Sequence, residues 1–91
     1  MLFVVVLKAH AGTLNERAAR RMQWDYPEGI NPVAEYRLQT DHPSVISIVE
    51  LDNVGLLTAL RMAWDDLFEV QAFPAVTADE GLEMLRQMAP A

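Results

Sequence analysis

The apolar run at residues 2–8 constrains the fold of this chain more than any other feature. Its sequence is Leu-Phe-Val-Val-Val-Leu-Lys. Because the side chains of a strand alternate between its two faces, a strand here would be apolar on both. A strand with one face in water would alternate apolar and polar residues, so this one must be covered on both sides. Helices of the chain can cover one face, and the other needs a partner chain, a ligand, or both. We therefore predict a central strand in a sheet that dimerises.

The segment after this strand predicts a helix that begins after Thr13 and ends near Trp24. Thr13 and Glu16 have the spacing of a capping box, in which both side chains bind backbone N–H groups at the start of a helix. The helix would place apolar residues on one face and basic residues mostly on others, namely Leu14, Ala18 and Met22 against Arg17, Arg20 and Arg21. The breakers Pro27 and Gly29 follow it.

Two further strands follow, joined by a turn. Residues 33–40 alternate in character, which suits an edge or half-exposed strand. Residues 41–44, Asp-His-Pro-Ser, have the composition of a turn. Residues 45–51 are apolar on both sides apart from Ser47 and Glu50, which predicts a second central strand.

The last third of the chain predicts a helix, a strand and a short terminal helix. Residues 52–53, Asp-Asn, can cap the first helix. Its apolar face would be Leu56, Leu57, Leu60, Trp64 and Leu67. Residues 68–76 predict an edge strand, because Pro74 cannot donate to a sheet. Thr77 and Glu80 form a second capping box before the short helix.

This order predicts a ferredoxin-like α+β fold, βαββαβ with a C-terminal helix and a four-stranded antiparallel sheet. The two doubly apolar strands are those that this topology places in the centre, with both crossover helices on one face. A length of 91 residues predicts one domain over residues 1–91. A core this small makes oligomerisation a natural source of additional stability.

Composition excludes several classes of function. A net charge of −6 disfavours nucleic acid as a partner, because phosphate contacts need clustered Lys and Arg. The chain has no cysteine, so disulfides, thiolate catalysis and Cys-ligated metals are excluded. The apolar run at residues 2–8 is too short to span a membrane and lacks the features of a signal peptide. We therefore expect a cytoplasmic protein with neither a membrane nor a nucleic-acid partner.

Four segments carry a resemblance to a known group of proteins: residues 1–5, 47–52, 63–70 and 74–76. They resemble a family of small uncharacterised bacterial and archaeal proteins in the dimeric α/β-barrel superfamily. That superfamily includes cofactor-independent monooxygenases, muconolactone-isomerase-like enzymes, chlorite-dismutase-like haem proteins and ligand-sensing domains. The resemblance implies a homodimer in which two sheets face each other around a cavity, and it leaves the activity open.

Glu50 and His10 are the candidates for a catalytic proton acceptor. Glu50 lies in an otherwise apolar strand, and a buried carboxylate without a partner takes the raised pKa that general bases use. The alternative is that Glu50 lies at the strand end, caps the adjoining turn, or pairs with Arg37 or Lys8. His10 and His42 lie in turns without metal-ligand spacing, so we predict no metal site.

Aromatic and polar residues provide candidates for ligand binding. Trp64 could form a wall of a pocket, with Asp65 at its mouth; alternatively the indole packs in the core and the acids are solvated or paired with arginine. Other candidates for lining a pocket for an aromatic or polar organic ligand are Trp24, Tyr26, Tyr36 and Arg37. Aromatic residues of a small domain are also common in cores and interfaces.

The leading functional hypothesis is a homodimeric module that binds a small organic ligand or acts in protein interactions. The alternative is a cofactor-independent monooxygenase or isomerase that acts on a small organic substrate, with Glu50 or His10 as the proton acceptor. Neither hypothesis requires a cofactor.

Overall fold

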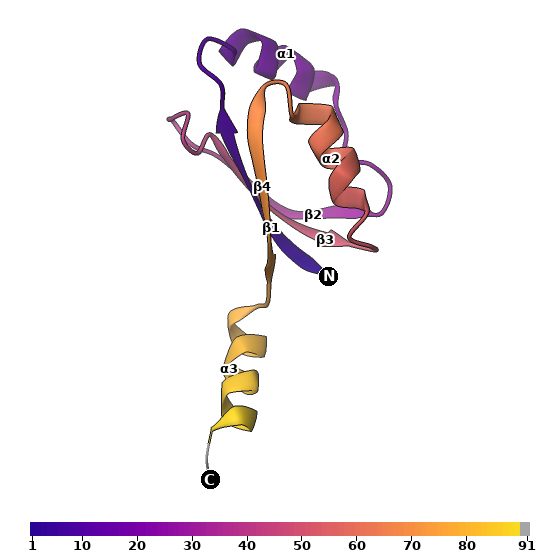
Figure 1. The fold of residues 1–91 in the computed structure, drawn as a ribbon, viewed down its shortest axis with the longest axis vertical. Helices are drawn as coiled ribbons and strands as arrows, with labels where there is room; N and C mark the ends of the chain where they lie inside the picture. The colour runs from indigo at the N-terminus through magenta and orange to yellow at the C-terminus, as the bar shows by residue number, and fades with distance from the viewer. Residues whose placement is uncertain (90–91) are drawn as a thin grey trace.

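The computed structural model describes residues 1–89 and contains four strands and three helices in the predicted order (Figure 1). The elements are β1 (Leu2–Ala9), α1 (Leu14–Gln23), β2 (Ile30–Arg37), β3 (Val45–Leu51), α2 (Leu56–Trp64), β4 (Phe68–Ala75) and α3 (Ala78–Met88). The strands form one antiparallel sheet in the order β2-β3-β1-β4. This confirms the ferredoxin-like α+β prediction, with the two doubly apolar strands in the centre. The single domain predicted over residues 1–91 includes positions 90 and 91, which lie outside the described residues.

The core lies between the sheet and the two crossover helices, α1 and α2, which cover the same face (Figure 1). Along β1, residues 3, 5, 7 and 9 are buried and the alternate positions 2, 4, 6 and 8 are only half-buried. Val5 and Val49 are completely buried on the two central strands. Each fully buried aliphatic side chain of this size contributes about 1.5–3 kcal/mol to folding. The opposite face of the sheet, at the half-buried positions, is covered by neither crossover helix.

Both edge strands contain a proline. Strand β2 begins at Ile30 and ends at Arg37, so the predicted range of 33–40 was three residues too late at both ends. Pro32 therefore lies inside the strand, where the pairing with β3 shifts register between Pro32 and Ala34. A proline is tolerated there because an edge strand does not need all of its N–H groups for pairing. Pro74 lies in β4, which is the other edge strand, as predicted.

One of the three predicted helix caps forms. The Thr77 hydroxyl accepts a hydrogen bond from the Glu80 N–H at 3.1 Å. The Thr13 cap was wrong, because this hydroxyl donates to the His10 carbonyl oxygen at 2.7 Å instead. The backbone explains the difference: an N-cap side chain needs an extended residue, and ψ is 160° at Thr77 but only 9° at Thr13. The cap predicted at residues 52–53 was also wrong, because α2 begins three residues later, after Gly55.

The predicted apolar face of α1 was wrong at its two ends, although Ala18 between them is half-buried. Leu14 is 68% exposed and Met22 is 82% exposed, whereas Arg17 is buried. The reason lies in the aromatic residues beneath the helix. The guanidinium carbons of three arginines each lie 5.6 Å from a ring centroid, pairing Arg17 with Phe68, Arg20 with Trp64 and Arg21 with Trp24. Such stacking lets the long aliphatic stems of arginine cover apolar surface while the cation interacts with the ring face.

The C-terminal helix α3 projects away from the sheet and the other helices (Figure 1). Its apolar side chains are at least half exposed, and they are Leu82, Met84, Leu85 and Met88. An isolated helix of 11 residues is marginal in water, because most helical stability in proteins comes from packing. Among residues 1–89, none of the helices has both the length and the apolar character that crossing a membrane requires.

Candidate functional site

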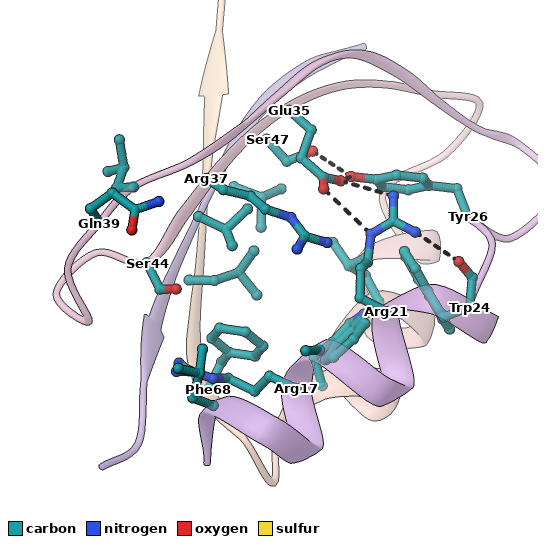
Figure 2. Close-up of a pocket in the computed structure, with 18 residues that line it drawn as sticks. Arg17, Arg21, Trp24, Tyr26, Glu35, Arg37, Gln39, Ser44, Ser47 and Phe68 are labelled. Atoms are coloured by element: carbon teal, nitrogen blue, oxygen red, sulfur yellow. Dashed lines mark hydrogen bonds and ion pairs between the residues drawn. The ribbon is translucent and has the colours of Figure 1, made fainter. Parts of the chain in front are cut away.

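A cavity of about 220 Å³ lies between α1 and the helix-covered face of the sheet. Figure 2 shows the side chains that surround it, which come from β1, β2, β3, α1, α2 and the start of β4. Its apolar wall consists of Val5, Leu7, Val45, Leu60, Trp64 and Phe68. Its polar side chains are Arg17, Arg21, Tyr26, Glu35, Arg37, Gln39, Ser44 and Ser47. The cavity thus joins a hydrocarbon surface to a group of polar side chains.

The two ends of the cavity differ in exposure. Val5, Ser47 and Trp64 are buried and form its inner part. Arg37 and Leu38, beside the C-terminal end of β2, are exposed and also line it. The entrance therefore lies between the end of β2 and the start of α1.

A hydrogen-bonded network centred on Glu35 forms one wall. The Tyr26 hydroxyl lies 2.5 Å from Glu35 Oε1 and 2.7 Å from Ser47 Oγ. Arg21 approaches the same carboxylate with Nε and Nη2, each at 3.4 Å, and donates from Nη1 to the Trp24 carbonyl oxygen at 2.9 Å. Dashed lines in Figure 2 mark these contacts. Glu35 can lie here because it pairs with Ser47 across β2 and β3, so both side chains project toward α1.

This network fixes the charge of its members. Burial opposes ionisation of Glu35, but the hydrogen bonds from Tyr26 and Arg21, together with the charges of Arg21 and Arg37, outweigh it and lower the pKa of this carboxyl. Burial, and then the hydrogen bond to Glu35, raise the pKa of Tyr26 to about 12. At neutral pH the wall therefore contains a carboxylate paired with Arg21 and a neutral phenol.

Arg17 lies along the floor of the cavity beside Phe68 (Figure 2). Its side chain is buried, and its Nε and Nη1 have no hydrogen-bond partner among residues 1–89. Nη2 lies 3.6 Å from Oδ1 of Asp41, whose carboxylate is exposed. This distance is too long for a hydrogen bond. Leaving a buried donor unpaired costs about 1–3 kcal/mol, and more for a charged group. Arg17 is thus a buried cation that lines the cavity and has two unpaired donors.

The cavity carries an excess of positive charge. Three arginines line it, Arg17, Arg21 and Arg37, against one carboxylate, Glu35. The formal charge of the lining is therefore +3 − 1 = +2. Arg37 extends from β2 toward the centre of the cavity (Figure 2) and forms no ion pair within the described part of the chain. This local charge contrasts with the net −6 of the whole chain.

The structure brings four of the predicted pocket-lining residues together: Trp24, Tyr26, Arg37 and Trp64. The two indoles meet edge to face, with their ring centroids 5.4 Å apart. Tyr36 pairs with Ile46 on the opposite face of the sheet and is 59% exposed. Asp65 is exposed at the end of α2 and does not line this cavity. The adjacent Asp66 binds Arg20 through both oxygens at 2.7 and 2.8 Å, which is the arginine pairing considered for these acids.

The two candidate proton acceptors lie outside the cavity. Glu50 is on the face that the helices do not cover, where it is half exposed and 3.6 Å from the N-terminal ammonium group. Its cation partner is therefore the chain terminus rather than Arg37 or Lys8. His10 is exposed in the turn after β1. The catalytic role of either residue stays a prediction.

Sequence reasoning missed six polar residues of the cavity: Arg17, Arg21, Glu35, Gln39, Ser44 and Ser47. A signal was available in α1, because Arg17, Arg21 and Trp24 have the spacing i, i+4 and i+7 of one helix face. The usual assumption that arginines face solvent hid it. Within residues 1–89 the structure contains no cluster of three His, Asp or Glu side chains that could hold a metal ion.

The chain was compared with protein families, curated proteins and solved structures. Residues 1–89 match the family described as Domain of unknown function (DUF3303), so the chain belongs to that family. No curated protein and no solved structure matches it. The family description assigns no activity, so the function has to be argued from the cavity and the surfaces of the protein.

Proposed function

We propose that this member of the DUF3303 family is a homodimeric domain that binds a small organic ligand in the cavity between α1 and the sheet. The observation that carries the proposal is the composition of the cavity. Ligand sites are concave and mostly apolar, with a few convergent polar groups that orient the ligand. Here a continuous apolar wall from Val5 to Phe68 faces three arginines.

The size of the cavity limits the ligand. Its volume of about 220 Å³ is the space that about seven water molecules occupy in the liquid, at about 30 Å³ each. Sites for drug-sized molecules begin at about 300 Å³. The ligand is therefore a molecule with one ring or a short chain, rather than a nucleotide or a haem.

Binding is favoured over acid–base catalysis by the state of Glu35. A general base is most effective when its pKa lies near the working pH. The pKa of Glu35 is shifted the other way, and its carboxylate is already held by Tyr26 and Arg21. The alternative of a cofactor-independent monooxygenase or isomerase would require Glu50 or His10, which lie elsewhere.

The proposed homodimer forms through the sheet face that the helices leave open. The central cross-strand row on this face is apolar and consists of Ala34, Ile48, Val4 and Phe73. The rows beside it each combine apolar and polar residues: Tyr36, Ile46, Val6 and Gln71 on one side, and Asn31, Glu50, Leu2 and Ala75 on the other. Tyr36 and Phe73 are 59% and 50% exposed in the single chain. A contiguous apolar surface on a small protein indicates an interaction site. Two copies packed face to face would form the dimeric α/β barrel that the sequence resemblance implies.

The projecting helix α3 supports the same assembly. It has apolar side chains without a packing partner in its own chain, including Leu82 and Leu85. In a two-fold dimer each chain would offer α3 to its partner symmetrically. In the dimer, the second copy would bury both the sheet face that α1 and α2 leave open and the apolar side chains of α3.

Native mass spectrometry of freshly purified protein tests the ligand and the dimer together. We expect a dimer that carries a small-molecule adduct released on denaturation. Ala18→Phe should abolish the adduct because Ala18 lines the cavity, whereas Ala19→Phe, on the exposed side of the same helix, should retain it. Circular dichroism would establish that both variants are folded. A folded Ala18→Phe protein that keeps the same adduct would place the ligand elsewhere, and a wild-type monomer would refute the dimer.

A further inference from the structure

We propose that the ligand of this cavity is a small organic carboxylate, bound by Arg17 and Arg37 with its apolar part against the wall that includes Leu60 and Phe68. This inference rests on the proposed function and specifies the chemical class of the ligand.

The first argument is the unused hydrogen-bonding capacity of Arg17. Its side chain is 7% exposed, so water has little access to it. Two of its three guanidinium nitrogens lack a partner within residues 1–89. Buried polar groups in folded proteins are almost always paired, so two unpaired donors on a residue that lines the cavity point to a missing acceptor. An arginine cannot avoid this by losing its proton.

The second argument is charge. Glu35 neutralises only one of the three arginines, and its hydrogen bonds with Tyr26 and Arg21 keep it ionised and fixed. The Asp41 carboxylate near Arg17 is 56% exposed and lies outside the cavity lining. A ligand with one or two negative charges would balance the formal +2 of the lining. With a neutral ligand, Arg37 would have no ion pair within residues 1–89, and Arg17 would have only the exposed Asp41 carboxylate at 3.6 Å.

The third argument concerns the kind of anion. Guanidinium groups match the planar, two-oxygen geometry of a carboxylate. The neighbouring wall of Val5, Leu7, Leu60, Trp64 and Phe68 has no polar side chain and suits an aryl or alkyl body. No glycine lines the cavity within the described residues, so the backbone cradle typical of phosphate sites is lacking. A carboxylate on a short hydrocarbon or aromatic body would bind the arginines with its charged group and contact the apolar wall with its body.

Isothermal titration calorimetry with matched acids and amides tests the class of ligand. The probes are benzoate, phenylacetate and hexanoate, each against its amide, with inorganic phosphate as a further anion. We expect at least one acid to bind about tenfold or more tightly than its amide, the size of a charge-assisted hydrogen bond. Arg17→Met should remove that preference. Arg37→Gln should weaken it, and because Arg37 is exposed this variant does not threaten folding. Arg61→Met, an exposed arginine of α2 outside this cavity, is the matched control.

The outcomes separate this inference from the proposed function. Amides that bind as tightly as acids, with both lost in Ala18→Phe, would keep the cavity as a ligand site and refute the carboxylate. Phosphate that binds while the three acids do not would also refute it. If the wild-type protein carries an adduct, the released molecule must contain a carboxylate. Absence of an adduct together with no binding of any probe would overturn both proposals.

Discussion

Replacing Arg17 by methionine should stabilise the ligand-free protein while it removes ligand binding. Methionine has a similar length and keeps the packing against Phe68, where a thioether contacts an aromatic ring favourably. The substitution removes a buried cation whose Nε and Nη1 have no partner within residues 1–89. A residue retained for binding at the expense of stability behaves in this way.

The magnitude follows from the contacts of Arg17. Relief of two unpaired buried donors is worth about 1–3 kcal/mol each, or about 2–6 kcal/mol in total. Against this stand the contact with the exposed Asp41, worth about 0–1 kcal/mol, and the stacking on Phe68, worth about 0.5–2 kcal/mol. The contact of the methionine sulfur with the Phe68 ring recovers part of the lost stacking energy. The midpoints of these ranges are about 4 kcal/mol gained and about 2 kcal/mol lost, so we expect a net gain of about 2 kcal/mol in the free energy of unfolding. For a domain of this size each kcal/mol raises Tm by about 4–8 °C.

Urea denaturation followed by circular dichroism, with thermal melts at fixed protein concentration, measures this change. Concentration must be held constant because a dimer gains apparent stability with concentration. Arg61→Met, at an exposed site, should change stability by less than about 0.5 kcal/mol. An Arg17→Met protein that is less stable than wild type by about 1 kcal/mol or more, the size of a typical destabilising mutation, would show that Arg17 is a structural partner of Asp41 and Phe68.

Two further predictions concern the assembly and the polar wall of the cavity. Val4→Asp and Val5→Asp change adjacent residues of β1 that face opposite sides of the sheet. Val5→Asp should unfold the chain, because an unpaired charge in the core costs about 3–5 kcal/mol. Val4→Asp should instead give a folded monomer, measured by size-exclusion chromatography with light scattering. A dimeric Val4→Asp protein would argue against an interface on the open face of the sheet. Glu35→Gln should reduce the loss of stability in acid, measured by urea denaturation at a series of pH values. The folded-state pKa of Glu35 is lowered, so its contribution to the free energy of unfolding is present above the ordinary pKa of glutamate and is lost as pH falls through the lowered value. If the variant lost stability in acid as steeply as wild type does, this assignment would be contradicted.

The sheet was predictable from sequence because its signals are local and periodic. The double apolar character of residues 2–8 and 45–51 can be satisfied only in central strands, and both lie there. The prolines at positions 32 and 74 belong to edge strands for an equally local reason, although the predicted strand of residues 33–40 did not include Pro32. Helix starts were predicted less well, because a capping side chain works only if the backbone of its own residue is extended. That condition holds at Thr77 and fails at Thr13.

The amino-acid sequence by itself determined the order of the elements, the central position of β1 and β3, and the presence of a second apolar sheet face. It also placed Trp24, Arg37 and Trp64 among the candidates that line the cavity. Only the tertiary structure decided that Arg17 and Arg21 face inward. Hydrophobic periodicity assigns charged residues to the solvent, and it cannot represent an arginine whose stem packs on an aromatic ring contributed by a distant element, such as Phe68 of β4. The cavity and its positive charge arise from that long-range pairing of helix and sheet.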